Sequence, residues 1–143
     1  MKVVILCGGK GVRLGEVTQT IPKPMVSIGE RPILWHIMNI YASKGYKDFI
    51  LALGYKSKII KKFFLDQANI KNNVENKLAE DILELKNLFG NGWNITLFET
   101  GIHTMTGGRI KRLKKYLNKE TFMLTYGDGL ADIDIAKLNE FHF

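Results

Sequence analysis

The residues best suited to chemistry in this chain lie near its N-terminus, where glycines are followed by a cation. Gly8, Gly9 and Gly11 follow an apolar run over residues 3–6, and Arg13 comes two residues after the last glycine. Glycines allow the backbone to turn tightly and to approach a ligand, because no Cβ stands in the way. Successive N–H groups in such a turn bind anions, and Arg13 adds a full positive charge. The pattern predicts a site for a polyphosphate.

A second cation follows on a loop that two prolines stiffen. Pro22 and Pro24 flank Lys23, and each proline favours an extended conformation in the residue before it. Taken by itself, this pattern is typical of a surface loop with one exposed lysine. Beside the glycine loop, Lys23 is well placed to reach an anion, so we expect it to help bind the phosphates.

Two common phosphate-binding motifs do not match this segment. The lysine of a P-loop is followed by Ser or Thr, which binds magnesium, but Lys10 is followed by Gly11. The dinucleotide fingerprint needs a third glycine where this chain has Leu14. The remaining pattern, GGxGxRL followed by PKPM, resembles that of the sugar-phosphate nucleotidyltransferases. These enzymes make nucleotide sugars from a nucleoside triphosphate and a sugar 1-phosphate.

A candidate metal ligand lies far along the chain. Asp128 stands between Gly127 and Gly129, directly after a predicted strand over residues 121–126. An Asp-Gly pair by itself is typical of a turn. Magnesium, however, binds through one or two carboxylates together with the phosphates of a substrate. Because the glycine loop calls for a nucleoside triphosphate, we assign Asp128 to Mg²⁺.

These groups fit nucleotidyl transfer, which needs positioning and charge neutralisation more than covalent help from the protein. A sugar 1-phosphate is largely dianionic at neutral pH and is itself a nucleophile, so no general base is required. We expect Arg13 to hold the β- and γ-phosphates and Lys23 to neutralise the α-phosphate and the incoming sugar phosphate. Arg13 and Lys23 are therefore the candidate catalytic residues, and Asp128 would hold the metal.

Four segments, at residues 3–6, 49–53, 93–98 and 121–126, are predicted to be strands. The first two are continuous apolar runs typical of buried strands, whereas in the third Ile95 and Leu97 alternate with polar residues. Helical patterns lie between them without hairpin signals. We therefore predict a Rossmann-like open, mostly parallel sheet flanked by helices. In such a sheet the loops that follow the strands meet at the edge formed by the carboxyl ends, where ligands bind. The loops concerned span residues 8–25, 99–109 and 127–132.

Capping residues and apolar faces predict where the helices lie, and one segment between the helices has no definite pattern. Residues 68–92 are interpreted as an insertion of uncertain structure, in which residues 78–89 have mixed helical spacing. The predicted helices begin at Pro32, at Ser57 as the N-cap of a helix over residues 58–67, at Thr106 as the N-cap of a helix to about Leu117, and at residue 133.

Motifs further along the chain indicate which group of nucleotidyltransferases the sequence resembles. Thr100-Gly101, the stretch Met105-Thr106-Gly107-Gly108-Arg109 and the segments 32–38 and 125–129 resemble the glucose-1-phosphate cytidylyltransferases. This resemblance implies CTP and α-D-glucose 1-phosphate as substrates, CDP-glucose and pyrophosphate as products, and a place in polysaccharide synthesis. It further implies a nucleotide site lined by Leu6, Gly8, Gly9, Gly11, Val12, Arg13, Lys23, Thr104, Arg109 and Gly127.

Members of that family extend well beyond 143 residues. The resemblance therefore implies that residues 1–143 are the N-terminal, nucleotide-binding part of a nucleotidyltransferase domain, and that the full-length protein is a homo-oligomer. Two other interpretations stay open. One is a related enzyme that uses another base or sugar, and the other is a non-catalytic nucleotide-binding fragment.

Composition favours a single soluble domain: the chain has 143 residues, of which 45% are hydrophobic and 24% charged. No apolar run approaches the roughly 18 residues of a membrane span. The chain starts directly on a strand pattern instead of a signal peptide. The single cysteine, Cys7, excludes a disulfide framework and a cysteine metal cluster. We expect a cytoplasmic protein that has no membrane partner.

The net charge of +7 comes from 21 Lys and Arg against 14 Asp and Glu. Basic residues gather at 56–62 and 109–115, on expected helices, where such runs are usually solvated faces. No zinc finger, RNP-type aromatic pair or helix-turn-helix spacing accompanies them. Nucleic acid is therefore not an expected partner, and a basic nucleic-acid-binding module remains an alternative that rests on charge alone.

Overall fold

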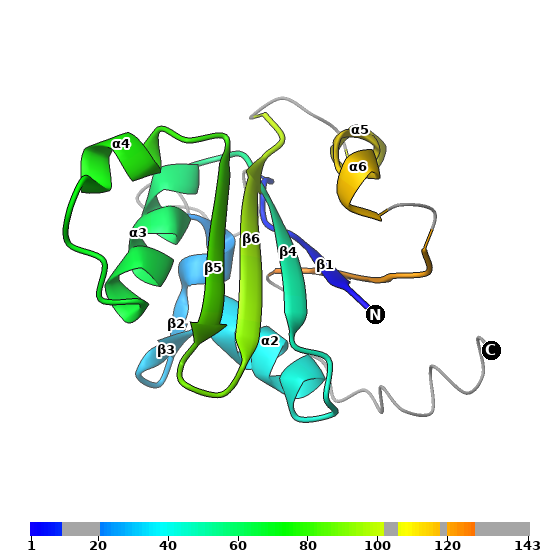
Figure 1. Ribbon diagram of the computed structural model, residues 1–143. Helices are drawn as coiled ribbons and strands as arrows, with labels where there is room; N and C mark the ends of the chain where they lie inside the picture. Colours follow the sequence, from blue (N-terminus) through cyan, green and yellow to red (C-terminus); the bar gives the residue numbers. More distant parts are fainter. Residues whose placement is uncertain (10–20, 102–105, 118–119, 128–143) are drawn as a thin grey trace.

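The computed structural model describes residues 1–9, 21–101, 106–117 and 120–127. Within these ranges one sheet has the strand order β5-β6-β4-β1-β7 (Figure 1). Strand β1 pairs in parallel with β4 and β7, β4 pairs in parallel with β6, and β5 runs antiparallel to β6. The prediction of an open, mostly parallel sheet is confirmed. The strands span Val3–Leu6 (β1), Asp48–Leu53 (β4), Ile82–Leu88 (β5), Trp93–Glu99 (β6) and Met123–Tyr126 (β7).

Strand β1 lies between helices on both faces of this sheet, which explains why it is apolar without alternation. Val3 and Ile5 belong to the core under α2 and α3, whereas Val4 and Leu6 belong to the core under α6. No helix in the described ranges is long and apolar enough to span a membrane. The remaining elements are η2 (Lys23–Met25), β2 (Ser27–Ile28), β3 (Arg31–Pro32), α2 (Ile33–Ala42), α3 (Ser57–Gln67), α4 (Val74–Leu78), α5 (Thr106–Arg112) and α6 (Lys114–Leu117).

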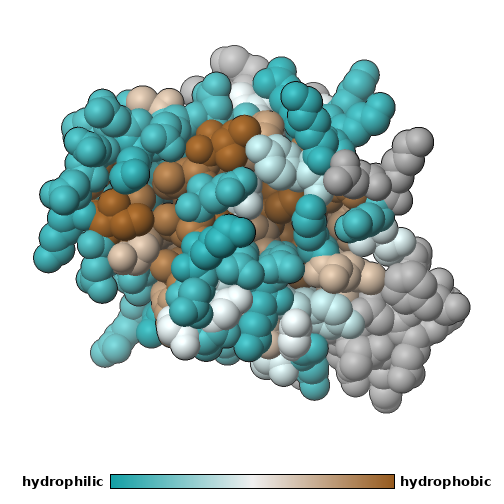
Figure 2. Space-filling view, viewed as in Figure 1, coloured by the Kyte–Doolittle hydropathy of each residue, from teal (hydrophilic) through white to brown (hydrophobic). Residues whose placement is uncertain are grey.

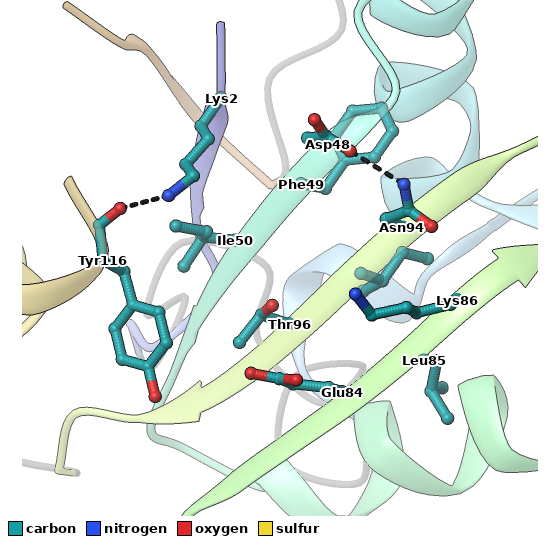
Figure 3. A pocket seen from close by; sticks show the side chains of 11 residues that line it. Lys2, Asp48, Phe49, Ile50, Glu84, Leu85, Lys86, Asn94, Thr96 and Tyr116 are labelled. Atoms are coloured by element: carbon teal, nitrogen blue, oxygen red, sulfur yellow. Dashed lines mark hydrogen bonds between the residues drawn. The ribbon is translucent and has the colours of Figure 1, made fainter. Parts of the chain in front are cut away.

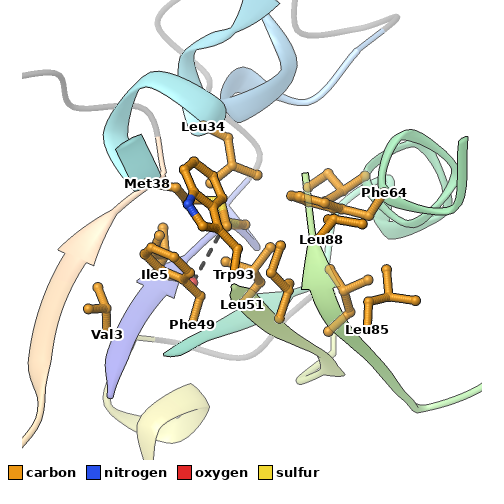
Figure 4. Packing of buried hydrophobic residues seen from close by; sticks show 14 of the residues in the cluster. Val3, Ile5, Leu34, Met38, Phe49, Leu51, Phe64, Leu85, Leu88 and Trp93 are labelled. Carbon is orange, nitrogen blue, oxygen red and sulfur yellow. Dashed lines mark hydrogen bonds between the residues drawn. The ribbon is translucent and has the colours of Figure 1, made fainter. Parts of the chain in front are cut away.

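The larger core is built around Trp93 (Figure 4). Its ring lies 5.6 Å from the ring of Phe49 on the neighbouring strand, and Leu34 and Met38 of α2 belong to the same buried cluster. Burial of each such large apolar side chain contributes roughly 1.5–3 kcal/mol. The cluster therefore fixes β4 and β6 against α2 at the amino end of β6, far from its carboxyl end.

The helix predicted to begin at Pro32 begins one residue later, at Ile33, and Pro32 is its extended N-cap. The prediction that Ser57 is an N-cap is wrong: Ser57 is the first residue of α3, and Lys56 precedes it with a φ of 50°. The cause is a tight turn after β4, in which the N–H of Ser57 donates to the carbonyl of Gly54 at 3.1 Å.

The single helix predicted from Thr106 to Leu117 is instead divided into α5 and α6. At Leu113 the N–H donates to the carbonyl of Ile110, only three residues back, at 3.0 Å. This tighter turn interrupts the regular α-helical hydrogen bonds. The helix predicted over residues 133–143 lies outside the described residues.

The segment 68–92 contains α4 and the edge strand β5, so the helical spacing proposed for residues 78–89 is wrong from Ile82 onward. Leu83 and Leu85 alternate with exposed residues and are buried. A turn with positive φ at Phe89, Gly90 and Gly92 joins β5 to β6. The sheet therefore ends in an antiparallel hairpin that the strand–helix alternation did not predict.

Candidate functional site

The carboxyl ends of β1, β4 and β6 lie side by side at one edge of the sheet. Two of the loops predicted to meet there, which begin at residues 8 and 99, belong to β1 and β6. Gly8 follows β1, Gly54 follows β4, and Thr100 and Gly101 follow β6. The link between them is the side chain of Arg109, which belongs to α5. Parallel pairing places the three strand ends at the same level, so that one long side chain reaches all of them.

The Arg109 guanidinium is buried and donates to four oxygens at this edge. Its Nη1 donates to the hydroxyl of Thr100 at 2.7 Å, to the carbonyl of Gly101 at 2.8 Å and to the carbonyl of Leu53 at 3.3 Å. Its Nη2 donates to the carbonyl of Gly8 at 3.0 Å. Burial lowers the pKa of Arg109 below its usual value, and the positive charge of Arg112 lowers it further.

Two glycines are required here because the guanidinium lies against the backbone. A Cβ on Gly8 would stand 2.1 Å from Nη1 of Arg109. A Cβ on Gly54 would stand 2.6 Å from the same Nη1, 2.8 Å from the carbonyl oxygen of Gly101 and 2.9 Å from that of Gly8. From the sequence, Gly8 is expected to let a ligand approach the backbone. The structure adds an internal reason, and it adds Gly54, which was not predicted to be part of the site.

The loop of Lys23 joins the same edge through Pro24 and Gly127. Gly127 follows β7, and its N–H donates to the carbonyl of Leu6 at 2.9 Å. A Cβ on Gly127 would lie 2.8 Å from Sγ of Cys7 and 3.2 Å from Cγ of Pro24. Pro24 is buried, and Lys23 is half-buried at the start of η2. The backbone carrying Lys23 is therefore packed against the ends of β1 and β7.

The described part of the chain thus brings together Gly8, Lys23, Arg109 and Gly127 of the predicted nucleotide site. Leu6 is the last residue of β1, and its side chain is buried in the core under α6. Gly9 is exposed, with open space where a Cβ would stand. The other predicted site residues lie outside the described residues; they are Gly11, Val12, Arg13, Thr104 and Asp128.

Among the described residues, no group of three or more His, Cys, Asp or Glu side chains is suited to hold a metal ion. The predicted metal ligand, Asp128, is bonded directly to Gly127 and so follows the strand whose end packs on Cys7 and Pro24. A carboxylate is the hard oxygen donor that magnesium prefers. The donor type at this position therefore fits the metal.

The interpretation of both basic runs as solvated faces is wrong for one member of each. Arg109 is buried as described above, and Lys61 is only 1% exposed. The Lys61 ammonium forms an ion pair with Glu99 at 2.9 Å and donates to the carbonyls of Leu78 and Glu80 at 3.1 and 2.6 Å. Two of the cations on which a nucleic-acid-binding role would depend are thus engaged inside the protein.

A separate cavity of about 390 Å³ lies on the open face of the sheet, over β4, β5 and β6 (Figure 3). Figure 2 shows this face of the molecule, where hydrophilic side chains surround smaller hydrophobic patches. The cavity is lined by residues that include Lys2, Glu84, Lys86 and Tyr116, and the Lys2 ammonium donates to the carbonyl of Tyr116. None of the predicted site residues lines it, so we place the candidate site at the carboxyl edge.

The comparison that decides the family is a match over residues 2–94 to the nucleotidyl transferase family. The chain belongs to the nucleotidyl transferase family. The match includes the glycine loop, Lys23, β4 and Gly54, and it ends just inside β6.

Individual nucleotidyl transferases are similar over nearly the whole chain. It is 51% identical to a probable glucose-1-phosphate cytidylyltransferase of Bacillus subtilis and 48% identical to the glucose-1-phosphate cytidylyltransferase of Salmonella typhimurium, over 99% of this chain and 56% of each relative. The crystal structure of HddC from Yersinia pseudotuberculosis complexed with GMP-PN superposes with a TM-score of 0.65 and 30% identity, over 98% of this chain and 53% of that one. The chain therefore spans a little over half the length of these proteins.

Proposed function

We propose that this chain is the nucleotide-binding part of an enzyme that transfers a cytidylyl group from CTP to α-D-glucose 1-phosphate. The products are CDP-glucose and pyrophosphate. The observation that carries the proposal is the identity of about one half, over 99% of the chain, to two glucose-1-phosphate cytidylyltransferases. The convergence of Gly8, Lys23, Arg109 and Gly127 at one edge of the sheet supports it.

In this proposal the reaction needs no general base, because a sugar 1-phosphate carries its own negative charge. The glycine loop binds the triphosphate through its N–H groups. Arg13 binds the β- and γ-phosphates and stabilises the departing pyrophosphate, and Lys23 neutralises the α-phosphate so that two anions approach each other. We assign Mg²⁺ to Asp128, where it would neutralise further charge on the phosphates.

Release of pyrophosphate tests the substrate assignment. The protein in its natural length is incubated with Mg²⁺, glucose 1-phosphate and one of CTP, UTP or dTTP, and pyrophosphate is measured. We expect kcat/KM to be highest for CTP. A higher kcat/KM for UTP or dTTP would select a related nucleotidyltransferase instead. The 143-residue chain is tested in parallel, since tight CTP binding without turnover would identify it as a nucleotide-binding fragment.

We predict that Arg13→Ala and Lys23→Ala each lower kcat/KM for CTP by more than about tenfold, which corresponds to about 1.4 kcal/mol in the barrier. Each variant removes a full positive charge that acts on the phosphates as charge develops on them. Lys44→Ala, at an exposed position after α2, is the matched control and should change kcat/KM by less than about twofold. Turnover within twofold of the parent for both Arg13→Ala and Lys23→Ala contradicts their assigned roles.

We also propose that the complete enzyme is a cytoplasmic homo-oligomer that supplies a nucleotide sugar for polysaccharide synthesis. The resemblance to glucose-1-phosphate cytidylyltransferases supports this assignment. Light scattering on the full-length protein measures the oligomeric state, and a mass equal to one subunit contradicts that part of the proposal.

A further inference from the structure

We propose that Arg109 and Thr100 are positioning residues that hold the glycine loop in its phosphate-binding conformation. This inference rests on the proposed function and goes beyond it, since Thr100 is assigned no role in the site above. We call the Arg109 guanidinium and its four acceptors, on Gly8, Leu53, Thr100 and Gly101, the Arg109 bridge.

The bridge links elements that are far apart in the sequence. Gly8 and Arg109 are 101 residues apart, yet Nη2 of Arg109 donates to the carbonyl of Gly8 at 3.0 Å. The other three acceptors lie at the ends of β4 and β6, which are fixed by the sheet. The guanidinium is planar and presents its donors in a rigid arrangement. The sheet therefore sets the position of the guanidinium, and the guanidinium sets the position of Gly8.

Thr100 orients the guanidinium. Its side chain is fully buried, and its hydroxyl donates to the carbonyl of Leu53 at 2.8 Å. With its proton committed to Leu53, the hydroxyl oxygen accepts from Nη1 of Arg109 at 2.7 Å. Thr100 thus connects β4 to the guanidinium, and a side chain of the same shape without the hydroxyl would lose both bonds.

Holding the Gly8 carbonyl also orients the next N–H group. In a trans peptide the C=O of one residue and the N–H of the next point in opposite directions. The Gly8 carbonyl is drawn toward Arg109 and also accepts from the N–H of Tyr55 at 3.1 Å. The N–H of Gly9 is therefore turned away from the buried guanidinium, and Gly9 is exposed. An N–H in this orientation is available to an anion, so the bridge acts on phosphate binding through Gly9.

The test compares Arg109→Met, Thr100→Val and their double variant in the 143-residue chain, with Lys111→Met as the matched control. Lys111 is exposed on the same helix and lies outside the bridge. Calorimetry measures the affinity for MgCTP and for cytidine, which lacks phosphates. Exchange of the Tyr55 amide proton, measured by NMR without ligand, reports whether the Gly8 carbonyl keeps its position.

We expect Arg109→Met to weaken MgCTP binding at least 30-fold while cytidine binding changes less than threefold, and Tyr55 exchange to become at least tenfold faster. Thr100→Val should weaken MgCTP binding about fivefold. The double variant should be within about twofold of Arg109→Met, because both residues act through the same bridge. Lys111→Met should leave the MgCTP affinity and the exchange rate within twofold of the parent.

Additive losses in the double variant, together with unchanged Tyr55 exchange, would mean that Arg109 contacts the phosphates directly and would overturn the inference. Equal losses of CTP and cytidine affinity would overturn it as well. If the parent chain does not bind MgCTP, the proposed function of this chain fails, whereas the ligand-free exchange rates still test the bridge. Should Arg109→Met not fold, Arg109→Lys, which keeps the charge and fewer of the donors, replaces it with an expected intermediate effect.

Discussion

Gly54→Ala should lower the free energy of unfolding by roughly 3–5 kcal/mol. The new Cβ would stand 2.8 and 2.9 Å from two backbone carbonyl oxygens, which belong to strand ends and have little room to move, and 2.6 Å from Nη1 of Arg109. Overpacking of a tight site costs about 1–3 kcal/mol. Displacing the buried guanidinium also weakens hydrogen bonds to a charged group, each worth about 1.5–3 kcal/mol. Urea denaturation followed by circular dichroism measures the change.

Gly8 and Gly107 serve as comparison positions for the Gly54→Ala prediction. The three atoms nearest to a Cβ on Gly8 all belong to the Arg109 guanidinium and none to the backbone, so we expect Gly8→Ala to destabilise less than Gly54→Ala. Gly107, in α5, has open space around an added Cβ. Because alanine favours a helix over glycine by up to about 1 kcal/mol, Gly107→Ala should leave stability unchanged or raise it. A Gly54→Ala variant within about 0.5 kcal/mol of the parent would contradict the packing argument.

The general plan of the fold is predictable from the sequence because two strong patterns agree. The apolar runs that became β1 and β4 are buried on both faces, and such strands are typical of a parallel sheet between helices. Strand β5 was missed because its residues include a helical spacing of leucines. Two signals could have indicated the hairpin: Leu83 and Leu85 alternate with polar residues, and Asn91-Gly92, a pair typical of hairpin turns, follows them.

The meeting of the site loops was predictable, but the Arg109 bridge was not. The carboxyl ends of parallel strands lie at the same edge of a sheet. The sequence pattern is therefore enough to predict that Gly8 and Gly127, which follow the paired strands β1 and β7, lie near each other. The bridge depends on how far one side chain reaches from a helix to backbone carbonyls. No local pattern encodes that distance. Gly54, directly after a buried strand, was the one local indication of a close approach.

Two adjacent lysines on α3 also show that a local sequence pattern does not reveal a long-range contact. Lys61 and Lys62 are identical in type, but Lys61 is buried and Lys62 is about half exposed. The helical spacing does distinguish them: Lys61 lies three and four residues before the buried Phe64 and Leu65, on the apolar side of the helix. What the spacing does not reveal is the partner of Lys61, which is Glu99, the last residue of β6.

The second large loss of stability is expected for substitution of Lys61, the buried member of this pair. We expect Lys61→Met to lower the free energy of unfolding by about 3 kcal/mol, because the carbonyls of Leu78 and Glu80 lose their donor and the partly buried Glu99 carboxylate loses its cation. Methionine keeps most of the chain length, so the loss reports the ammonium group and its bonds rather than a large cavity.

Lys62→Met is the matched control on the same helix. Lys62 pairs with Asp66 at 2.7 Å, but both side chains are half exposed, at 50% and 55%. An exposed i,i+4 pair contributes only about 0.3–0.5 kcal/mol. The two variants differ in position by one residue and carry the same chemical change, so unfolding in urea compares burial directly. Equal losses in the two variants would show that the buried lysine bonds contribute no more than an exposed pair, and would remove Lys61 as the link between α3, the α4–β5 segment and β6.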